Sequence, residues 1–347
     1  MKKNLLLSLT FILLVALSIF VIVTNAKNFT WDLFLSSIVD SRKEFLIAAL
    51  VCMAGFIVFE GLALRTLTIG LLGNHPVKRV RGVMYSAADI YFSAITPSAT
   101  GGQPASALFM MMDGIPGGIT TIILLINVTM YTLAIMVLGL FAVIVRPFFY
   151  VKFTVLSRIL IAVGYVILGG FFFLFILLMR KASFVKKMAE GITKIGIKLH
   201  LVKRPERIQQ KIDKVMDDYR ECAHSVSGKK SVLVKSFIFN LLQRLSQVLV
   251  TVFVYLAMKG SLSQCFDVFI AQIYTVVGAN SIPIPGAVGV SDYVLIDALN
   301  DVVGVGNYVN IELVSRGISF YACVLISGVM IAVGYLVYKK KNKGVEE

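Results

Sequence analysis

Residues 84–112 read MYSAADIYFSAITPSATGGQPASALFMMM, an apolar segment that is interrupted in its middle. An apolar run of about twelve residues stops at Thr96–Pro104, and a shorter run follows over Ala105–Met112. Neither run has the roughly 20 residues that a helix needs to cross a bilayer core. Broken backbone at membrane depth is tolerated only where it is buried in protein or lines a polar cavity. The segment therefore predicts a helical hairpin that enters a membrane and returns to the same side.

A second segment, residues 266–299, has the same form and reads FDVFIAQIYTVVGANSIPIPGAVGVSDYVLIDAL. Its apolar runs are separated by Ile282–Gly289, and both interruptions contain a proline followed by a glycine four residues later. We expect a second re-entrant hairpin here. The alternative for both segments is a kinked, shallow helix in an ordinary bundle, because Pro and Gly are common in membrane helices.

The composition of the whole chain agrees with a membrane protein. Of its 347 residues 58% are hydrophobic and 15% charged, and the mean hydropathy is +0.85. This leaves too little charge to cover a soluble protein of this size, which excludes cytosolic enzymes, nucleic-acid-binding domains and disordered chains. The four cysteines form no CxxC pair, so they predict neither a disulfide framework nor a metal site. We expect no cofactor.

Six further stretches are long and apolar enough to cross a bilayer. The first is preceded by two lysines and resembles a signal peptide, but its 19 uninterrupted apolar or small residues favour an uncleaved anchor. The six predicted spans are Leu5–Val23, Phe45–Leu64, Ile119–Val145, Ile159–Met179, Ser236–Met258 and Gly317–Tyr338.

The Lys and Arg residues of the connections predict the orientation of these spans. With the N-terminus in the cytoplasm, the inside segments hold 23 Lys and Arg residues and the outside segments hold 7. This asymmetry predicts a multi-pass protein of a bacterial-type cytoplasmic membrane with both termini in the cytoplasm. It also requires the hairpin of residues 84–112 to open to the cytoplasm and the hairpin of residues 266–299 to open to the outside.

The predicted fold is therefore an all-α integral membrane protein with six spanning helices and two re-entrant helical hairpins. Residues 1–347 form a single polytopic membrane domain. Residues 45–145 run span, hairpin, span, and residues 236–338 repeat that order in the opposite direction, which is the inverted repeat found in transporters. Between them, residues 180–231 carry 14 basic against 6 acidic residues. They predict a basic cytoplasmic connection that contacts anionic lipid headgroups.

Several ionisable residues lie within the apolar segments, where they are costly and usually face an interior or a wet cavity. They are Glu60, Asp89, Arg244, Asp292 and Asp297. Arg244 lies eight residues beyond Ser236, roughly 12 Å along the helix axis, and needs a partner such as Glu60 or Asp292, or an anionic ligand. Arg65 and Arg316 lie nearer the ends of their spans, where they either extend to the membrane surface or bind lipid.

The two interruptions are suited to binding an anion. A half-helix that begins after Gly101-Gly102, with Pro104 in its first position, presents unpaired amides to a phosphate or carboxylate. After Gly289 a second half-helix begins near Ser291 with Asp292 in its first turn, and these two residues could equally serve only as caps. The sequence has no H-E-x-x-H, G-x-S-x-G or P-loop pattern, so it carries no enzyme signature.

These residues resemble the lysylphosphatidylglycerol synthase transmembrane-region family, the flippase portion of the multiple peptide resistance factor, which also occurs as free-standing proteins. The resemblance rests on ITPSATGGQP at residues 95–104, IPGAVGVSD at residues 284–292, Leu64-Arg65 and Ser315-Arg316, and covers nearly the whole chain. Gln103 and Asp292 stand where glutamate is often seen in the family. The first change removes a charge and the second keeps it.

The resemblance implies translocation of a polar or aminoacylated phospholipid such as lysyl-phosphatidylglycerol, and a contribution to cationic peptide resistance. Two alternatives remain open: a transferase that modifies lipid headgroups, of the phosphatidylglycerol lysyltransferase or glycolipid type, and a membrane partner of a separate synthase or glycosyltransferase. We expect no synthase domain in this chain and no nucleic-acid partner. A homo-oligomer is compatible with the sequence. The residues expected to bind lipid are Glu60, Arg65, Pro97, Gly101, Gly102, Gln103, Arg244, Pro285, Gly286, Gly289, Asp292 and Arg316.

Overall fold

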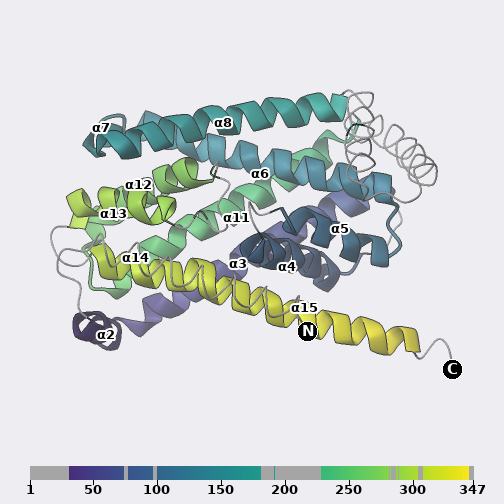
Figure 1. Ribbon diagram of the computed structural model, residues 1–347, viewed down its shortest axis with the longest axis horizontal. Coiled ribbons are helices and arrows are strands. Elements are labelled where there is room, and N and C mark those ends of the chain that lie inside the picture. Colours follow the sequence, from purple (N-terminus) through teal and green to yellow (C-terminus); the bar gives the residue numbers. More distant parts are fainter. Residues whose placement is uncertain are drawn as a thin grey trace.

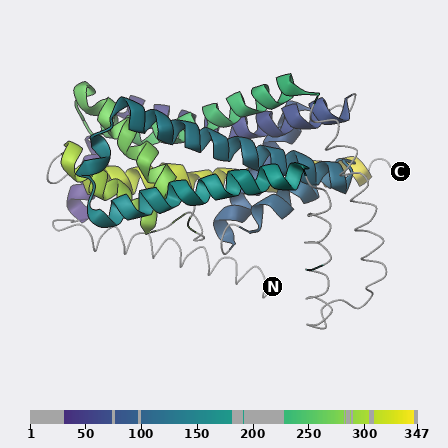
Figure 2. The ribbon, with the colours of Figure 1, turned by 90° about the horizontal axis from the view of Figure 1, so that it is seen from above.

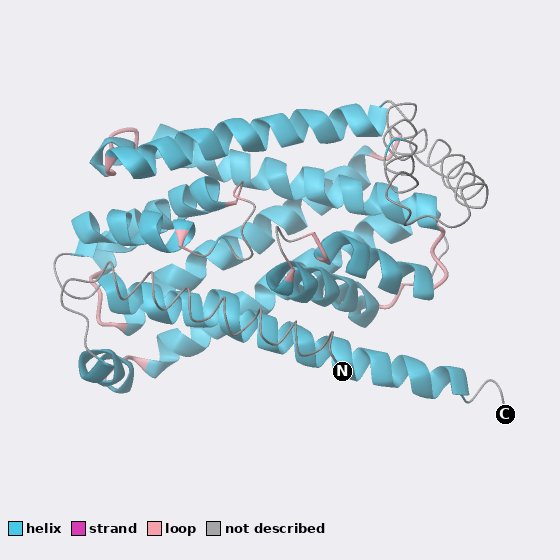
Figure 3. Cartoon of the chain, viewed as in Figure 1, coloured by secondary structure: helices cyan, strands magenta, loops and turns pink. Residues whose placement is uncertain are grey.

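The computed structural model describes residues 31–73, 77–96, 100–180, 191, 228–280, 282, 287, 289–303 and 308–343. Within these residues the chain forms helices joined by short turns and contains no strand (Figure 3). The predicted all-α fold is therefore confirmed. The main helices are α2 (Trp31–Val39), α3 (Lys43–Leu72), α4 (Arg79–Ile95), α5 (Gly102–Met112), α6 (Gly117–Val145), α7 (Phe149–Lys152), α8 (Val155–Arg180), α11 (Lys230–Ala257), α12 (Cys265–Ala279), α13 (Val290–Val303), α14 (Tyr308–Arg316) and α15 (Cys323–Lys343).

Six helical segments of the described residues are long and apolar enough to cross a membrane. Five of them contain or overlap predicted spans: Lys43–Leu72, Gly117–Val145, Val155–Leu178, Lys230–Ala257 and Tyr308–Gly334. The predicted span Leu5–Val23 lies outside the described residues. The sixth segment, Leu262–Ala279, has 18 residues and was predicted as the first arm of a hairpin.

Both predicted hairpin segments fold as pairs of short helices that pack against each other. The first pair is α4 with α5, and the second is α12 with α13. Figure 1 shows the first pair in the right half of the molecule and the second in the left half. The structure thus has the helix, break, helix order of both segments. Their re-entrant course in a membrane stays a prediction.

Helices α3 and α11 form the central contact of the molecule and run antiparallel along its long axis (Figures 1 and 2). At one end the Lys229 ammonium donates to the Leu71 carbonyl over 3.3 Å. At the other end the backbone amide of Arg42 donates to the Ala257 carbonyl over 2.8 Å. Each of the two helices therefore begins beside the end of the other.

Close helix contacts in this bundle depend on glycine. Gly61 of α3 lies against Gly82 of α4, and a Cβ atom on Gly82 would overlap the Gly61 carbonyl. In the same way a Cβ atom on Gly164 of α8 would overlap the Val277 carbonyl of α12. Small residues let helix backbones approach where lipid offers no hydrophobic driving force for association. They bring α4 and α8 tightly against the core.

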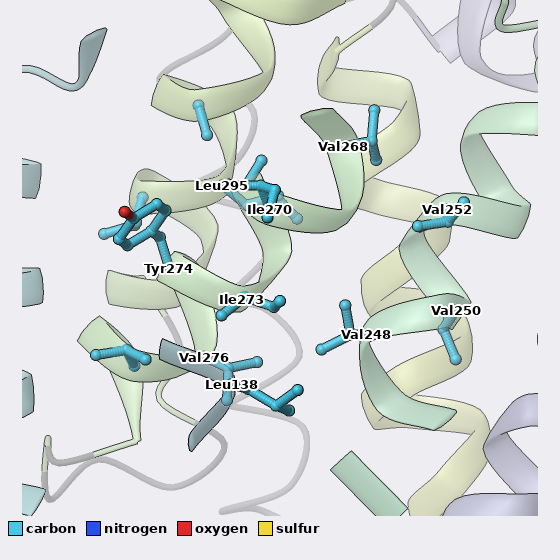
Figure 4. Close-up of a cluster of buried hydrophobic side chains, with 14 of the residues drawn as sticks. Leu138, Val248, Val250, Val252, Val268, Ile270, Ile273, Tyr274, Val276 and Leu295 are labelled. Carbon is cyan, nitrogen blue, oxygen red and sulfur yellow. The ribbon is translucent and has the colours of Figure 1, made fainter. Parts of the chain in front are cut away.

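The apolar core lies between α6, α11, α12 and α13, and α8 covers it from the outside. Buried side chains of this core are shown in Figure 4, among them Leu138, Val248, Ile270, Tyr274 and Leu295. The outer face of α8 remains apolar and exposed, with Val166 74% and Phe173 70% accessible. This combination is typical of a helix that faces lipid. The second hairpin is thus part of this core, whereas Tyr85 of α4 and Met110 of α5 belong to a separate apolar cluster with α3 and α6.

Candidate functional site

The first polar cluster lies inside the bundle where α3, α4, α5 and α11 meet, and we name it the Arg244 cluster. It consists of Glu60, Asp89, Gln103, Gln243 and Arg244. Its charged members are buried, with Glu60 6%, Asp89 8% and Arg244 9% exposed. Helix α3 extends to Leu72 rather than ending near Leu64, so Glu60 lies well within its helix.

Each carboxyl group of the Arg244 cluster accepts hydrogen bonds from neutral side chains. Glu60 Oε2 accepts from Ser86 Oγ and from Gln243 Nε2, both over 3.0 Å. Asp89 Oδ2 accepts from Gln103 Nε2 over 2.7 Å, and Asp89 Oδ1 accepts from Ser93 Oγ over 3.2 Å. The two carboxyl groups also interact with each other. The cluster therefore joins α3, α4, α5 and α11 through two buried acids.

The first break is shaped around Asp89. A Cβ atom on Gly102 would overlap Asp89 Oδ1 and Ser93 Oγ, so only glycine leaves room for these acceptors. The Gly101 amide donates to Thr96 Oγ1 over 2.9 Å, which satisfies one of the amides that were predicted to bind an anion. Helix α5 begins at Gly102, so Pro104 is its third residue rather than its first. The amide of Gln103 can donate to Asp89, whereas an ionised glutamate could only accept.

Arg244 has an unusual environment for a buried cation. Its Nη1 donates to Gln247 Oε1 over 2.8 Å, and its Cζ lies 4.6 Å from the ring centroid of Tyr131 and 5.4 Å from that of Phe56. Its Nε is buried and has no hydrogen-bond partner in the described part of the chain. Within that part no carboxylate oxygen lies within 4.0 Å of its nitrogens. Glu60 and Asp89 act on it at longer range.

The second polar cluster, which we name the Arg316 cluster, lies at the start of α13 and the end of α14. Arg316 Nη2 lies 2.6 Å from Asp292 Oδ1 and donates to Ser291 Oγ over 2.7 Å. The Asp292 side chain is fully buried, and its Oδ2 accepts from the Gly289 amide over 2.9 Å. Asp292 thus caps α13 and also forms a buried ion pair. The φ angles of Ala287 and Gly289 are +48° and +84°.

Glu312 belongs to the same cluster and was not predicted from the sequence. It is 3% exposed, one helical turn before Arg316, and interacts with Asp292 and Arg316. Its Oε2 has no hydrogen-bond partner among the described residues. The signal for it is the spacing of Glu312 and Arg316, an i, i+4 acid and base pair on one helix face. A π-helical turn, η4 (Gly317–Ala322), follows at once, a feature often found at functional sites.

The two clusters are connected through η4, which packs against α3 and α11. Cys323, directly after η4, interacts with Glu60 of the first cluster. Two other predicted residues lie elsewhere: Arg65 Nε donates to the Val77 carbonyl over 2.8 Å, and Asp297 accepts from Thr154 over 2.9 Å. Arg65 thus fixes the start of α4 rather than joining a cluster.

The structure brings most of the predicted site residues together. Glu60, Gln103 and Arg244 lie in the first cluster, and Asp292 and Arg316 lie in the second. Gly101, Gly102 and Gly289 border them, whereas Pro97, Pro285 and Gly286 lie outside the described residues. The described residues contain no group of three His, Cys, Asp or Glu side chains that could hold a metal. Buried charges of both signs suit a charged organic group.

The sequence matches one family model over almost its whole length. The model is described as "Lysylphosphatidylglycerol synthase TM region" and covers residues 6–327. No curated protein matches the chain. The matched region contains both polar clusters and both hairpin segments.

Proposed function

The chain belongs to the lysylphosphatidylglycerol synthase transmembrane-region family, and we propose that it moves a polar or aminoacylated phospholipid between the leaflets of the cytoplasmic membrane. The family links the protein to lysyl-phosphatidylglycerol synthesis or translocation. Translocation requires that a charged headgroup crosses the apolar interior while its acyl tails stay in lipid. A buried site with both charge signs meets this requirement, because it replaces the water that the headgroup loses.

The observation that carries this proposal is the guanidinium of Arg244, buried without a carboxylate within 4.0 Å among the described residues. A buried arginine normally has an anionic partner, since an unpaired charge at membrane depth costs several kcal/mol. A lipid phosphate is such a partner and can accept two parallel hydrogen bonds from the planar guanidinium. The unpartnered Nε is one available donor. In the absence of a phosphate, cation–π contacts with the rings of Tyr131 and Phe56 stabilise the guanidinium.

The acids of the Arg244 cluster would hold a cationic part of the headgroup. Glu60 and Asp89 are in the same cluster as Arg244, whereas Asp292 is already paired with Arg316. Glu60 is therefore a better candidate for this role than Asp292. A headgroup that carries both a phosphate and an ammonium group would bind the whole cluster.

Reconstitution into liposomes tests the proposal. We expect labelled lysyl-phosphatidylglycerol to reach the opposite leaflet in wild-type liposomes, with at least a tenfold loss for Arg244→Ala and partial recovery for Arg244→Lys. The matched control is Asp301→Asn, which removes an exposed charge on α13 and should leave transport unchanged. Thermal unfolding of each variant in detergent shows whether it is folded.

Full transport by a folded Arg244→Ala protein would reject the phosphate-binding role. Chemical modification of the headgroup when a donor is supplied would favour a transferase instead. Mass spectrometry of lipids that co-purify with the protein identifies the lipid, and we expect an anionic or aminoacylated phospholipid. In cells, loss of the protein should increase sensitivity to cationic peptides.

A further inference from the structure

The carboxyl groups of Glu60 and Asp89 interact inside the bundle, where Glu60 Oε2 accepts from Ser86, one helical turn before Asp89 on α4. An ionised carboxylate only accepts hydrogen bonds, so two carboxyl groups can bond to each other only when one of them carries a proton. Both are buried, and two buried like charges in contact raise each other's energy strongly. One proton shared between the two acids removes this repulsion.

The charges around this pair favour the same state. The other titratable or charged groups that interact with it are Arg244 from α11, Tyr131 from α6 and Cys323 at the start of α15. From α5 the contact is the neutral Gln103, and Arg316 and Glu312 belong to the second cluster. One shared proton leaves a single negative charge, which balances the single positive charge of Arg244. The cluster is then neutral without a ligand.

A second observation indicates that a donor group can replace this proton. The Nε2 amide group of Gln243 donates a hydrogen bond to Glu60. The Oε1 atom of Gln243 is buried and has no hydrogen-bond partner among the described residues. The residue is only 1% exposed. An unmet acceptor beside two acids matches an ammonium group, which has three donors and no acceptor. Glu60, Asp89 and Gln243 Oε1 would receive one donor each.

We propose that Glu60 and Asp89 hold one proton that is exchanged for the ammonium group of the lipid. On binding, the ammonium takes its place between the two carboxylates, and the proton leaves to water. One proton is released for each ammonium bound, so the net charge of the site is unchanged. The exchange couples lipid movement to a pH gradient. The coupling to a pH gradient rests on the proposed translocation, whereas the exchange itself needs only binding of the lipid.

Proton release on binding tests the exchange without any transport. Wild-type protein in dodecyl maltoside and weak buffer is mixed with lysyl-phosphatidylglycerol micelles, and a pH-indicator dye reports protons after subtraction of protein-free micelles. We expect about one proton per protein with lysyl-phosphatidylglycerol and none with phosphatidylglycerol, which lacks the ammonium. Glu60→Gln and Asp89→Asn should abolish the release, whereas Asp301→Asn should keep it. The absence of release from a wild-type protein that binds the lipid would overturn the exchange.

A pH gradient across liposomes tests the coupling. Reversing the gradient should change the initial rate of lysyl-phosphatidylglycerol translocation several-fold in the wild type and in Asp301→Asn. The two kinds of failure are distinct. Proton release without translocation would support the exchange and reject the proposed function. Translocation that is insensitive to the gradient, with no proton release, would overturn the exchange and leave the proposed function intact.

Discussion

The Arg244 and Arg316 clusters have the same parts in different arrangements. Each contains one buried arginine and two buried acids, and the two arginines are equally buried, at 9% and 8% exposed. Arg316 lies 2.6 Å from Asp292. Arg244 lies instead against two aromatic rings and has no carboxylate within 4.0 Å among the described residues.

The difference shows how one residue type serves two purposes in the same bundle. The charge of Arg316 is used within the protein, where it ties the start of α13 to the end of α14. The charge of Arg244 is stabilised by weaker cation–π contacts, worth about 2 kcal/mol when desolvated. A ligand phosphate can displace those contacts more easily than a buried ion pair. We therefore expect mutations in the Arg316 cluster to reduce mainly the stability of the fold. Mutations in the Arg244 cluster should reduce mainly the binding and translocation of lipid.

The two hairpins are predicted to open to opposite sides of the membrane, and labelling of introduced cysteines gives an all-or-none test of this orientation. Pro116, between α5 and α6, and Asn300, near the end of α13, are both exposed. Figure 1 shows α5 in the right half of the molecule and α13 in the left half. With the native cysteines replaced, Pro116→Cys should react with an impermeant thiol reagent from the cytoplasm and Asn300→Cys from outside. Asp113 is a poorer site for labelling because it is paired with Arg81. Reaction of both from one side would exclude the inverted repeat.

Removal of Arg316 should have the largest effect on stability. Arg316→Ala leaves Asp292, which is fully buried, without its ion-pair partner, and breaking such a pair from one side costs about 3–5 kcal/mol. Arg244→Ala should cost about 2 kcal/mol or less, since no carboxylate of the described residues lies within 4.0 Å of Arg244 and no close ion pair is broken. Chemical unfolding in detergent micelles measures both free energies.

A double variant is the control for this difference. Asp292→Asn with Arg316→Gln removes both charges and should recover part of the lost stability, because no unpaired charge remains buried. If Arg316→Ala were as stable as the wild type, or Arg244→Ala were the less stable of the two, the division of roles between the clusters would be wrong.

The sequence predicts the helical fold, five of the spans and the position of both breaks, because these depend on local hydropathy and on Pro and Gly. It also predicts Arg244 and Asp292 as buried charges, because a charge within an apolar run is visible in the sequence alone. The partners are different. That Arg316 pairs with Asp292, and that Arg244 pairs with neither predicted acid, depends on how far helices distant in sequence are rotated and shifted. Asp89 and Gln243 belong to the Arg244 cluster because of contacts between helices that are distant in sequence.

Glycine substitutions at the two breaks compare steric with conformational requirements. Gly102→Ala would place a Cβ atom onto Asp89 and Ser93, and we expect a loss of about 1–3 kcal/mol, the usual cost of overpacking. Gly289→Ala would force a residue with a Cβ atom to keep a φ of +84°, at a cost of about 1–2 kcal/mol. Gly102→Ala should also impair translocation, because it displaces Asp89.

Gly170 provides the matched control for these two changes. It lies within α8 with open space around it, so Gly170→Ala should be neutral or stabilise the helix by up to about 1 kcal/mol. Unfolding free energies of the three variants separate the effects. A loss for Gly170→Ala equal to the loss for Gly102→Ala would show that the break has no special requirement for glycine.

The smallest effects are expected at the outer ends of the hairpins, where one ion pair joins α4 to the end of α5 and another joins the end of α6 to α12. Arg81 lies 3.1 Å from Asp113, which also accepts from the Tyr85 hydroxyl over 2.5 Å, and the two charged side chains are 25% and 15% exposed. Arg146 lies 3.3 Å from Asp267, and these side chains are 50% and 28% exposed. Exposed pairs contribute about 0–1 kcal/mol and are screened by salt. We expect Arg146→Gln to cost well under about 1 kcal/mol and Arg81→Gln to cost more.

Salt separates these contributions from packing effects. Because the Arg81 pair is less exposed and shares Asp113 with a tyrosine, its loss should persist in about 1 M salt, where the Debye length is about 3 Å. The smaller effect of Arg146→Gln should disappear under the same conditions, apart from any contribution of its contact with the Phe266 ring, 5.5 Å away. Equal and fully salt-sensitive losses would mean that both ends are held by surface charge alone. In that case the polar contacts that hold the two hairpins would lie at their inner ends, at Asp89 in one half and Asp292 in the other.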